Sequence, residues 1–351
     1  MKTLLLFLIM LSVIIIIHEG GHLLAAKKFG VYCYEFSIGM GPVLWKKETK
    51  ETQYSIRALP LGGFVSMAGE VDGDEAYPDV EVPDDRRLIN KPWWQKCIIM
   101  LAGIFMNFIL AFVLFSLTIL CNGGYYDEAK AVVGNVQSGS PAEVAGLQAG
   151  DKIIKVESDG KSVYPETFTD LVSFNTEGKP EVYTVERNSE ELKVTVTPSY
   201  DEENQRYLIG IYAPEREFIK VNFLTCWVSG AKDMVMLTKA TANAFSELFK
   251  GIGVKNLSGP VGIYQATKTY SSQGLLTYLL LIAQISFSVG FFNLLPLPVL
   301  DGGQVVITLI EALVHRRLNT KVKMGIMLAC WAMLILMMLA VTYMDITKLF
   351  N

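Results

Sequence analysis

Histidine is scarce in this chain, with only three among 351 residues, and basic charge is not in excess. The 31 Lys and Arg are outnumbered by 35 Asp and Glu, so the formal net charge is −4 and no broad basic surface is available to bind nucleic acid. The five cysteines are scattered and form no CxxC pair. They predict free thiols packed as small apolar side chains, which excludes a disulfide framework and a zinc knuckle.

Charged residues make up only 19% of the chain, whereas apolar residues make up 51% and the mean hydropathy is +0.34. We therefore expect a membrane protein with a water-soluble part. Apolar runs predict four membrane-spanning segments, at residues 1–26, 98–121, 275–314 and 324–343, the third interrupted by NLLPLPVLDGG. The first run also suits a cleaved signal peptide, because Lys2 precedes an apolar core, and the run alone leaves both interpretations open.

The segments between the apolar runs differ in character. Residues 27–97 are polar, with β-favouring patches between Gly and Pro, and predict a loop with a β-hairpin. The acidic end of this loop, residues 70–87, predicts a mobile segment. Residues 126–213 alternate polar and apolar residues and predict a sheet-rich soluble domain. Residues 214–258 predict amphipathic linker helices, because charges recur along them.

Lysine and arginine gather in two connecting loops. HRRLNTKVK lies between the third and fourth spans, and the first loop begins with Lys27 and Lys28. The positive-inside rule places both loops in the cytoplasm. Both termini and the sheet-rich domain then lie outside the cell membrane, and the end of the first span lies toward the cytoplasm.

The motif HEGGH ends the first apolar run. His18 and His22 are four residues apart, so on a helix their imidazoles stand on one face and can share a zinc ion. Glu19 lies beside them, where it can accept a proton from water at the metal. A histidine in an apolar helix is often only a hydrogen-bonded core residue. Because two of the chain's three histidines take this spacing around a glutamate, the motif favours a metal site.

A catalytic zinc ion with two histidine ligands needs a third protein ligand. Asp301 is the best candidate, because it lies at membrane depth, where an unpaired carboxylate is costly. The third histidine, His315, is set among basic residues at the end of a span and suits an interfacial position. The alternative for Asp301 is an N-cap of the helix that follows it.

At this point the sequence resembles the site-2 protease family of intramembrane zinc metalloproteases, in particular its bacterial branch with a PDZ domain. The resemblance is carried by HEGGH, GIFMN ending at Asn107, SGPVGI at 258–263 and NLLPLPVLDGG at 293–303. It implies Zn²⁺ bound by His18, His22 and Asp301, with Glu19 as general base. It also implies that the first span is retained and is not a signal peptide.

The resemblance implies substrate-binding residues as well. Asn293 matches a family asparagine that holds the substrate strand near the zinc. Asn107 is a second candidate, although Ile104 stands where relatives often have proline. The cytoplasmic stretch YSIRALPLGGFVSMAGE resembles a membrane-associated β-loop that pairs with the unwound substrate. It would bring three residues near the substrate: Gly62, Gly63 and Phe64. A surface hairpin with ordinary turn glycines remains the alternative for each of them.

The soluble domain resembles a bacterial PDZ domain through SGSPAEVAGLQAGDKIIKVESDGKSV, residues 138–163. Such a domain binds an extended peptide or C-terminal ligand by strand addition, or it acts as a steric filter against bulky ectodomains. The sequence leaves both roles open.

Together these features predict a multi-pass α-helical membrane protein with an inserted α+β, β-rich PDZ domain outside the bacterial cytoplasmic membrane. Its expected activity is hydrolysis of peptide bonds within single-span membrane proteins already cut on the outside, such as anti-sigma factors or remnant signal peptides. The expected partners are these substrates, membrane lipid and a PDZ ligand, with no nucleic acid. A non-catalytic PDZ-bearing membrane scaffold is the main alternative, and a transporter is a third.

Overall fold

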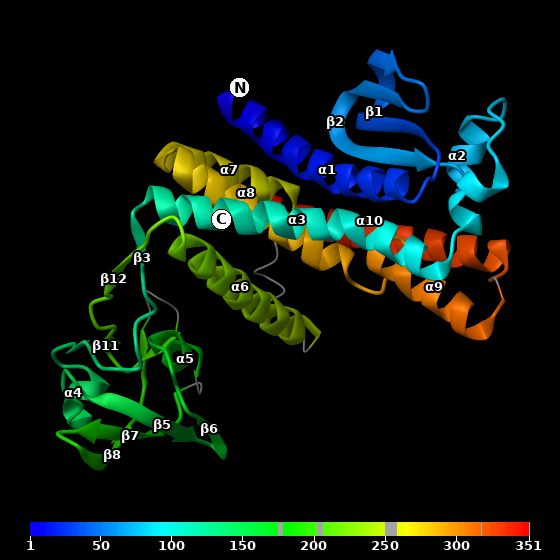
Figure 1. Cartoon of the computed structure of the whole chain (residues 1–351). Helices are drawn as coiled ribbons and strands as arrows, with labels where there is room; N and C mark the ends of the chain where they lie inside the picture. Colours follow the sequence, from blue (N-terminus) through cyan, green and yellow to red (C-terminus); the bar gives the residue numbers. More distant parts are fainter. Residues whose placement is uncertain (175–177, 202–205, 250–257, 317, 351) are drawn as a thin grey trace. The chain divides into compact units, whose positions relative to one another are not determined.

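The computed structural model describes the chain from residue 1 to 350, except residues 175–177, 202–205, 250–257 and 317 (Figure 1). The chain divides into two compact units. The first unit joins Met1–Asn122 to Asn222–Asn351, and the second is Gly123–Val221. The second unit is thus an insertion between two helices of the first.

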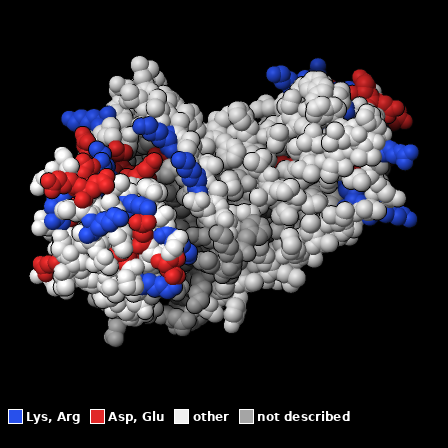
Figure 2. Space-filling model, turned by 90° about the horizontal axis from the view of Figure 1, so that it is seen from below, with Lys and Arg blue, Asp and Glu red and all other residues white. Residues whose placement is uncertain are grey.

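Four helices are long and apolar enough to cross a membrane, which confirms the prediction of a multi-pass membrane protein. They are α1 (Lys2–Lys28), α3 (Trp93–Cys121), α8 (Leu275–Asn293) and most of α10 (Thr320–Phe350). Figure 2 shows that the surface of this helical part carries few charged side chains, whereas Lys, Arg, Asp and Glu crowd the surface of the second unit. The composition of each unit therefore matches its solvent.

The third apolar segment is not one helix. The helix α8 ends at Asn293, irregular backbone follows through the two prolines, and α9 (Asp301–Val314) begins at the aspartate. Non-helical backbone at membrane depth is tolerated where protein encloses it. This break delivers Asp301 to the interior of the first unit.

The helix α3 is the centre of the first unit. It packs against α1, α8, α9 and the amphipathic α6 (Thr225–Phe249). Gly21 of α1 makes the closest approach, because a Cβ atom there would lie 2.5 Å from the Ala102 carbonyl oxygen of α3. Buried Met10 and Ile14 of α1 pack with Tyr278, Leu281 and Ile282 of α8. A small residue in α1 thus lets two helices meet at backbone distance.

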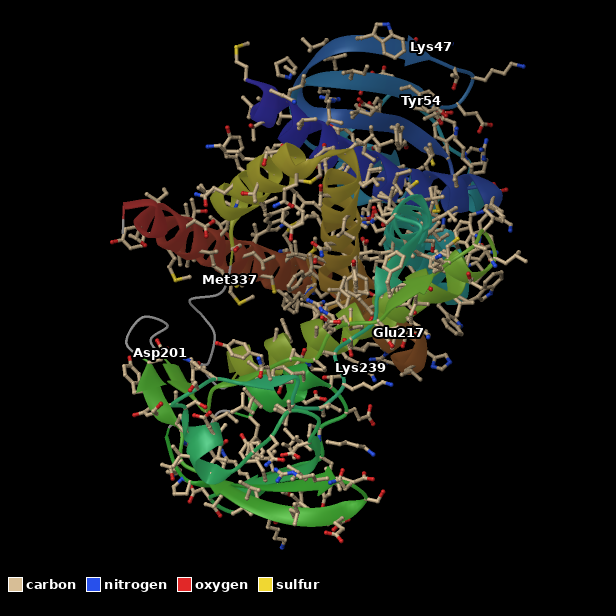
Figure 3. The ribbon with its side chains drawn as sticks, turned by 90° about the vertical axis from the view of Figure 1, so that its left-hand side faces the viewer. Lys47, Tyr54, Asp201, Glu217, Lys239 and Met337 are labelled. Atoms are coloured by element: carbon tan, nitrogen blue, oxygen red, sulfur yellow. The ribbon has the colours of Figure 1, made fainter. Side chains whose placement is uncertain are left out.

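The helix α10 differs from the other spans, since none of its apolar window is buried. Figure 3 shows Met337 pointing away from the neighbouring helices. One buried contact holds its end: the Asp345 carboxylate accepts hydrogen bonds from the Gly259 and Gly262 N–H groups, at 2.7 and 2.8 Å. These amides open α7 (Pro260–Gln273), so the carboxylate also compensates the unsatisfied donors of a helix start.

The predicted hairpin consists of β1 (Cys33–Glu48) and β2 (Gln53–Met67). The stretch 35–38 of β1 pairs with 53–56 on one side and 63–66 on the other. Its core packs on the end of α1 through Leu23, Ala26 and buried hairpin residues. Tyr54, labelled in Figure 3, accepts a hydrogen bond from Lys27 of α1 at 3.0 Å. The last stretch of β2 is paired on one side only.

The acidic segment at residues 70–87 was predicted to be mobile, and the structure corrects this. It contains α2 (Val71–Ala76) and the 3₁₀ turn η1 (Asp84–Arg86), followed by η2 (Leu88–Asn90). The Asp74 carboxylate accepts bonds from Tyr34 and from Arg87, so its charge is paired. The prediction was wrong because composition does not show that aromatic and arginine partners from elsewhere meet the acidic groups.

The second unit has a sheet of four strands in the order β6-β5-β7-β8. They are β5 (Lys152–Ser158), β6 (Lys161–Val163), β7 (Glu181–Arg187) and β8 (Glu190–Val196). Two short helices, α4 (Pro141–Ala145) and α5 (Phe168–Ser173), complete one core with it. In the stretch AGLQAGD, α4 ends at Gly146 with φ +88°, and β5 follows six residues later.

Four pairs of short strand segments flank or close this unit. They are β3 (Gly124–Tyr126) with β12 (Phe218–Lys220), β4 (Asn135–Val136) with β11 (Ile211–Tyr212), and β9 (Ser199–Asp201) with β10 (Arg206–Leu208), beside the isolated bridge of Val132 with Lys152. The β3–β12 pair extends the compact unit beyond the expected 126–213. Of the expected linker region 214–258, residues 250–257 lie outside the described part.

Candidate metal centre

Three side chains from two distant segments meet inside the first unit. His18 and His22 Nε2 lie 3.1 and 3.4 Å from Asp301 Oδ2, and the two Nε2 atoms are 3.3 Å apart. Among the described residues, these three form a group whose ligand atoms all lie within 4.8 Å of one another. The structure thus brings together the three residues predicted to bind metal.

The local sequence explains how each side chain reaches the group. His18 and His22 stand one turn apart on α1, with ring centroids 4.8 Å apart. Asp301 is the first residue of α9, whose N-cap Leu300 makes no side-chain cap bond. The Asp301 carboxylate is therefore turned to the imidazoles, and the capping role considered from the sequence is not what the structure shows.

The glycines after Asp301 fix its position. A Cβ atom on Gly302 would lie 2.8 Å from the Leu295 carbonyl oxygen, and one on Gly303 would collide with that of Leu297. Only glycine lets the start of α9 lie directly on the preceding turn. The LDGG stretch is thus packed as a rigid corner that presents the carboxylate.

The helix α3 forms the wall behind the histidines. The His22 Nδ1 atom lies 2.8 Å from the Ile99 carbonyl oxygen. The side-chain amide of Asn107 lies 3.1 Å from His18 Nδ1. Between them is Gly103, where a Cβ atom would lie 2.9 Å from His18 Cε1 and closer still to His22. Ile99 and Gly103 were not predicted as site residues; the GIFMN motif, which begins at Gly103, was the available signal.

The donor set fits a zinc ion. Two imidazoles and a carboxylate are zinc ligands, and tetrahedral ligand atoms about 2.0–2.1 Å from a metal lie about 3.4 Å from each other. The observed separations of 3.1–3.4 Å match this spacing. Asp301 Oδ2 is buried and accepts no hydrogen bond within the described structure. A buried carboxylate oxygen with no donor is what a cation would satisfy.

Comparison with known proteins decides the family. The model described as Peptidase family M50 matches residues 6–337. The chain belongs to this family, that of the site-2 proteases. It is accordingly a zinc metalloprotease and a membrane hydrolase, as predicted, with Zn²⁺ as its cofactor.

The relatives cover the full length of this M50 peptidase. A protein of Fusobacterium nucleatum named as a zinc metalloprotease is 34% identical over 351 residues, which are 99% of this chain and 100% of the relative. One from Clostridium acetobutylicum with the same kind of name is 35% identical, covering 97% and 96% of the two chains. The regulator of sigma-W protease RasP of Bacillus subtilis is 30% identical, covering 99% of each.

Glu19 of the M50 peptidase lies under the second strand of the hairpin. A Cβ atom on Gly63 would lie 3.5 Å from Glu19 Cγ, and only 2.8 Å from the Ser37 carbonyl oxygen and 2.9 Å from Ile15 Cγ2. Gly63 therefore allows β2 to lie against α1 beside the predicted general base. Its neighbours have other settings: Gly62 has φ +94°, and the Phe64 ring lies under the Arg57 guanidinium at 5.1 Å.

The hairpin is fastened by a buried carboxylate. Glu35 is 1% exposed and accepts hydrogen bonds from Arg57 at 2.8 and 2.9 Å, from Tyr77 at 2.5 Å and from Ser55. Burial alone would raise the pKa of Glu35, but these donors hold the pKa below its ordinary value. The strand beside Glu19 is thus part of a stable sheet.

The remaining predicted residue, Asn293, ends α8. Its side-chain amide donates a hydrogen bond to the Val289 carbonyl oxygen at 3.0 Å, one turn back in the same helix. Asn293 is half-buried and precedes the irregular turn that leads to Asp301. The described contacts of Asn293 are therefore those of a helix end, and its substrate role stays a prediction.

Proposed function

We propose that this M50 peptidase hydrolyses peptide bonds within the membrane-spanning segment of single-span proteins that have already been shortened on the outside. The observation that carries the proposal is the cluster of His18, His22 and Asp301, set with Glu19 among helices long enough to span a membrane. Catalytic groups at such depth are costly to bury, and a scissile bond at the same depth gives them a purpose.

In this proposal the roles follow from the chemistry of each side chain. His18, His22 and Asp301 hold the zinc ion, which supplies a Lewis acid for the attacking water and for the scissile carbonyl. Glu19, adjacent to His18 in α1, accepts the proton of the attacking water and delivers it to the leaving amine. The helices that enclose the group exclude bulk water, which strengthens these electrostatic interactions.

The hairpin offers a way to hold the substrate. A peptide bond in a helix is shielded, so the substrate segment must become extended before it can be cut. The last stretch of β2, with Gly63 beside Glu19, is paired on one side only. An extended substrate can add to its free edge through main-chain hydrogen bonds. Gly62, Gly63 and Phe64 would then lie near the scissile bond, and Asn293 would contact the substrate from the end of α8.

The topology and partners belong to the same proposal. The positive-inside rule favours a cytoplasmic hairpin, with the second unit and both termini outside. The second unit, as a PDZ domain, either excludes uncut ectodomains or binds a peptide. The name of the Bacillus subtilis relative, regulator of sigma-W protease, favours an anti-sigma factor among the substrates.

A trapping experiment tests the proposal. We expect Glu19→Gln to retain about one zinc per chain while the rate of cleavage of a model span falls by about 10²- to 10⁴-fold, the usual worth of a general base. Expressed in its native membrane, this variant should accumulate with uncut single-span proteins, identified by mass spectrometry. Glu215→Gln, an exposed carboxylate of the second unit, is the isosteric control. Normal cleavage by Glu19→Gln would favour the non-catalytic scaffold.

A further inference from the structure

One face of α3 carries three groups that lie against the imidazoles of α1. Ile99, Gly103 and Asn107 are spaced by four residues, so they follow one stripe of the helix. The first provides a carbonyl oxygen at His22 Nδ1, the second provides room for both rings, and the third provides a side-chain amide at His18 Nδ1. The stripe therefore contacts both histidines on the side away from Asp301.

The contact of His22 fixes its tautomer. A backbone carbonyl oxygen only accepts hydrogen bonds, so the proton of neutral His22 must be on Nδ1, which lies 2.8 Å from the Ile99 oxygen. The lone pair of His22 is then on Nε2, which is the atom that faces Asp301. The α3 backbone thus prepares His22 to bind a metal through Nε2.

His18 needs the same preparation, and only Asn107 is placed to give it. To bind a metal through Nε2, His18 must carry its proton on Nδ1, and that proton needs an acceptor. The Asn107 amide is the group 3.1 Å from Nδ1. Its oxygen and nitrogen exchange places by rotation of the amide, and with the nitrogen toward His18 the oxygen Oδ1 is buried without a donor.

We propose that Asn107 is a positioning residue, whose Oδ1 accepts a hydrogen bond from His18 Nδ1–H and thereby holds His18 ready to bind zinc through Nε2. This rests on the proposed function, in which His18 is a zinc ligand. The amide cannot serve the substrate directly, because Asn107 is 0% exposed.

The position of Asn107 is itself fixed by packing. Its backbone carbonyl accepts a hydrogen bond from Ser286 Oγ of α8 at 2.9 Å, where α3 and α8 are in contact. Gly103, one turn earlier, keeps the imidazoles close to the α3 backbone. The family difference at Ile104 leaves both Gly103 and Asn107 in place. The GIFMN motif thus has a physical role, which is to orient the two histidines.

Metal affinity tests the proposal without relying on activity. The full chain is purified in detergent, stripped of metal and titrated with Zn²⁺ against a chromophoric chelator, and the visible spectrum of the Co²⁺ form is recorded. We expect Asn107→Ala to weaken zinc binding by about 10- to 100-fold, as is typical when the partner of a ligating histidine is lost, and to alter the cobalt spectrum.

Two further variants separate hydrogen bonding from packing. Asn107→Asp replaces the amide by a group that only accepts, so zinc affinity should stay at or above that of the wild type. Ser286→Ala disturbs the α3–α8 contact but leaves the Asn107 side chain, and it should keep the wild-type affinity and spectrum. If Asn107→Ala does not fold, Asn107→Asp still decides, since a loss of affinity there would mean that the amide acts as a donor.

The outcomes distinguish this inference from the function on which it rests. Wild-type affinity in folded Asn107→Ala would overturn the positioning role while leaving the metal site intact. Unchanged zinc binding in His18→Ala would overturn both, because His18 would then not be a ligand.

Discussion

Two kinds of buried carboxylate occur in this molecule, one in the second unit and one among the membrane helices. Asp151 of the second unit is 1% exposed and receives two bonds from Arg187, each at 2.6 Å, and one from the Gln148 N–H at 2.9 Å. Asp301 faces two imidazoles instead, and its Oδ2 accepts no hydrogen bond. The first charge is fully compensated by the protein, and the second awaits a cation.

The difference shows how a structural ion pair is told from a metal site. An arginine fork satisfies both oxygens of a carboxylate, so Asp151, like Glu35 of the hairpin, needs no further ligand. Neutral imidazoles offer lone pairs and no second positive charge. A buried carboxylate among such groups is stable only when a metal ion joins them. Burial alone therefore does not identify the functional aspartate.

The largest expected effect comes from the same substitution at both sites. Asp301→Asn should lower the zinc content from about one per chain toward zero and abolish cleavage, because the anionic ligand is lost. Asp151→Asn should leave zinc content unchanged and destabilise the second unit by about 3–5 kcal/mol, the usual cost of breaking a buried pair. Metal analysis of the purified chains and hydrogen exchange of β7 measure the two results. Equal zinc loss in both variants would contradict the distinction.

A smaller effect should come from the helix contact that brings the ligands together. Gly21→Ala places a Cβ against the Ala102 carbonyl, so α1 and α3 must move apart. We expect a destabilisation of about 1–3 kcal/mol, as for overpacked cores, and weaker zinc binding. Gly20→Ala is the matched control, because a Cβ there meets nothing within 4 Å. The melting temperature and zinc affinity of both variants in detergent test this, and an equal loss in Gly20→Ala would show that helix contact is not the cause.

The smallest effect should appear on acidification and should be confined to the arginine-paired carboxylates. Burial alone would raise the pKa of Asp151, but the Arg187 guanidinium and the Gln148 N–H hold the pKa below its ordinary value. A carboxyl with a lowered folded pKa contributes stability above its unfolded pKa of about 3.9 and loses it as the pH falls toward the folded pKa. Hydrogen exchange of the second unit should therefore accelerate below about pH 4. Arg187→Met should flatten this dependence, and an unchanged pH profile would show that the pair contributes nothing.

Several elements could be predicted because their signals are local. The spans follow from uninterrupted apolar runs, and the hairpin follows from alternating residues between glycines. His18 and His22 are linked by helical spacing, and Asp301 stands out as a carboxylate at membrane depth. The acidic segment at residues 70–87 was predicted wrongly, because the partners of Asp74 include Tyr34, forty residues earlier in the chain.

The sequence by itself determined which chemical groups are present and which of them share a helix, since side-chain identity and helical spacing are properties of the chain. Only the tertiary structure decided that α9 brings Asp301 to the histidines of α1, and that Ile99 and Asn107 of α3 lie at their other nitrogens. The reason is that these contacts depend on how closely helices pack. Glycines such as Gly21 and Gly103 permit that closeness, but they show their effect only when the opposing backbone is in place.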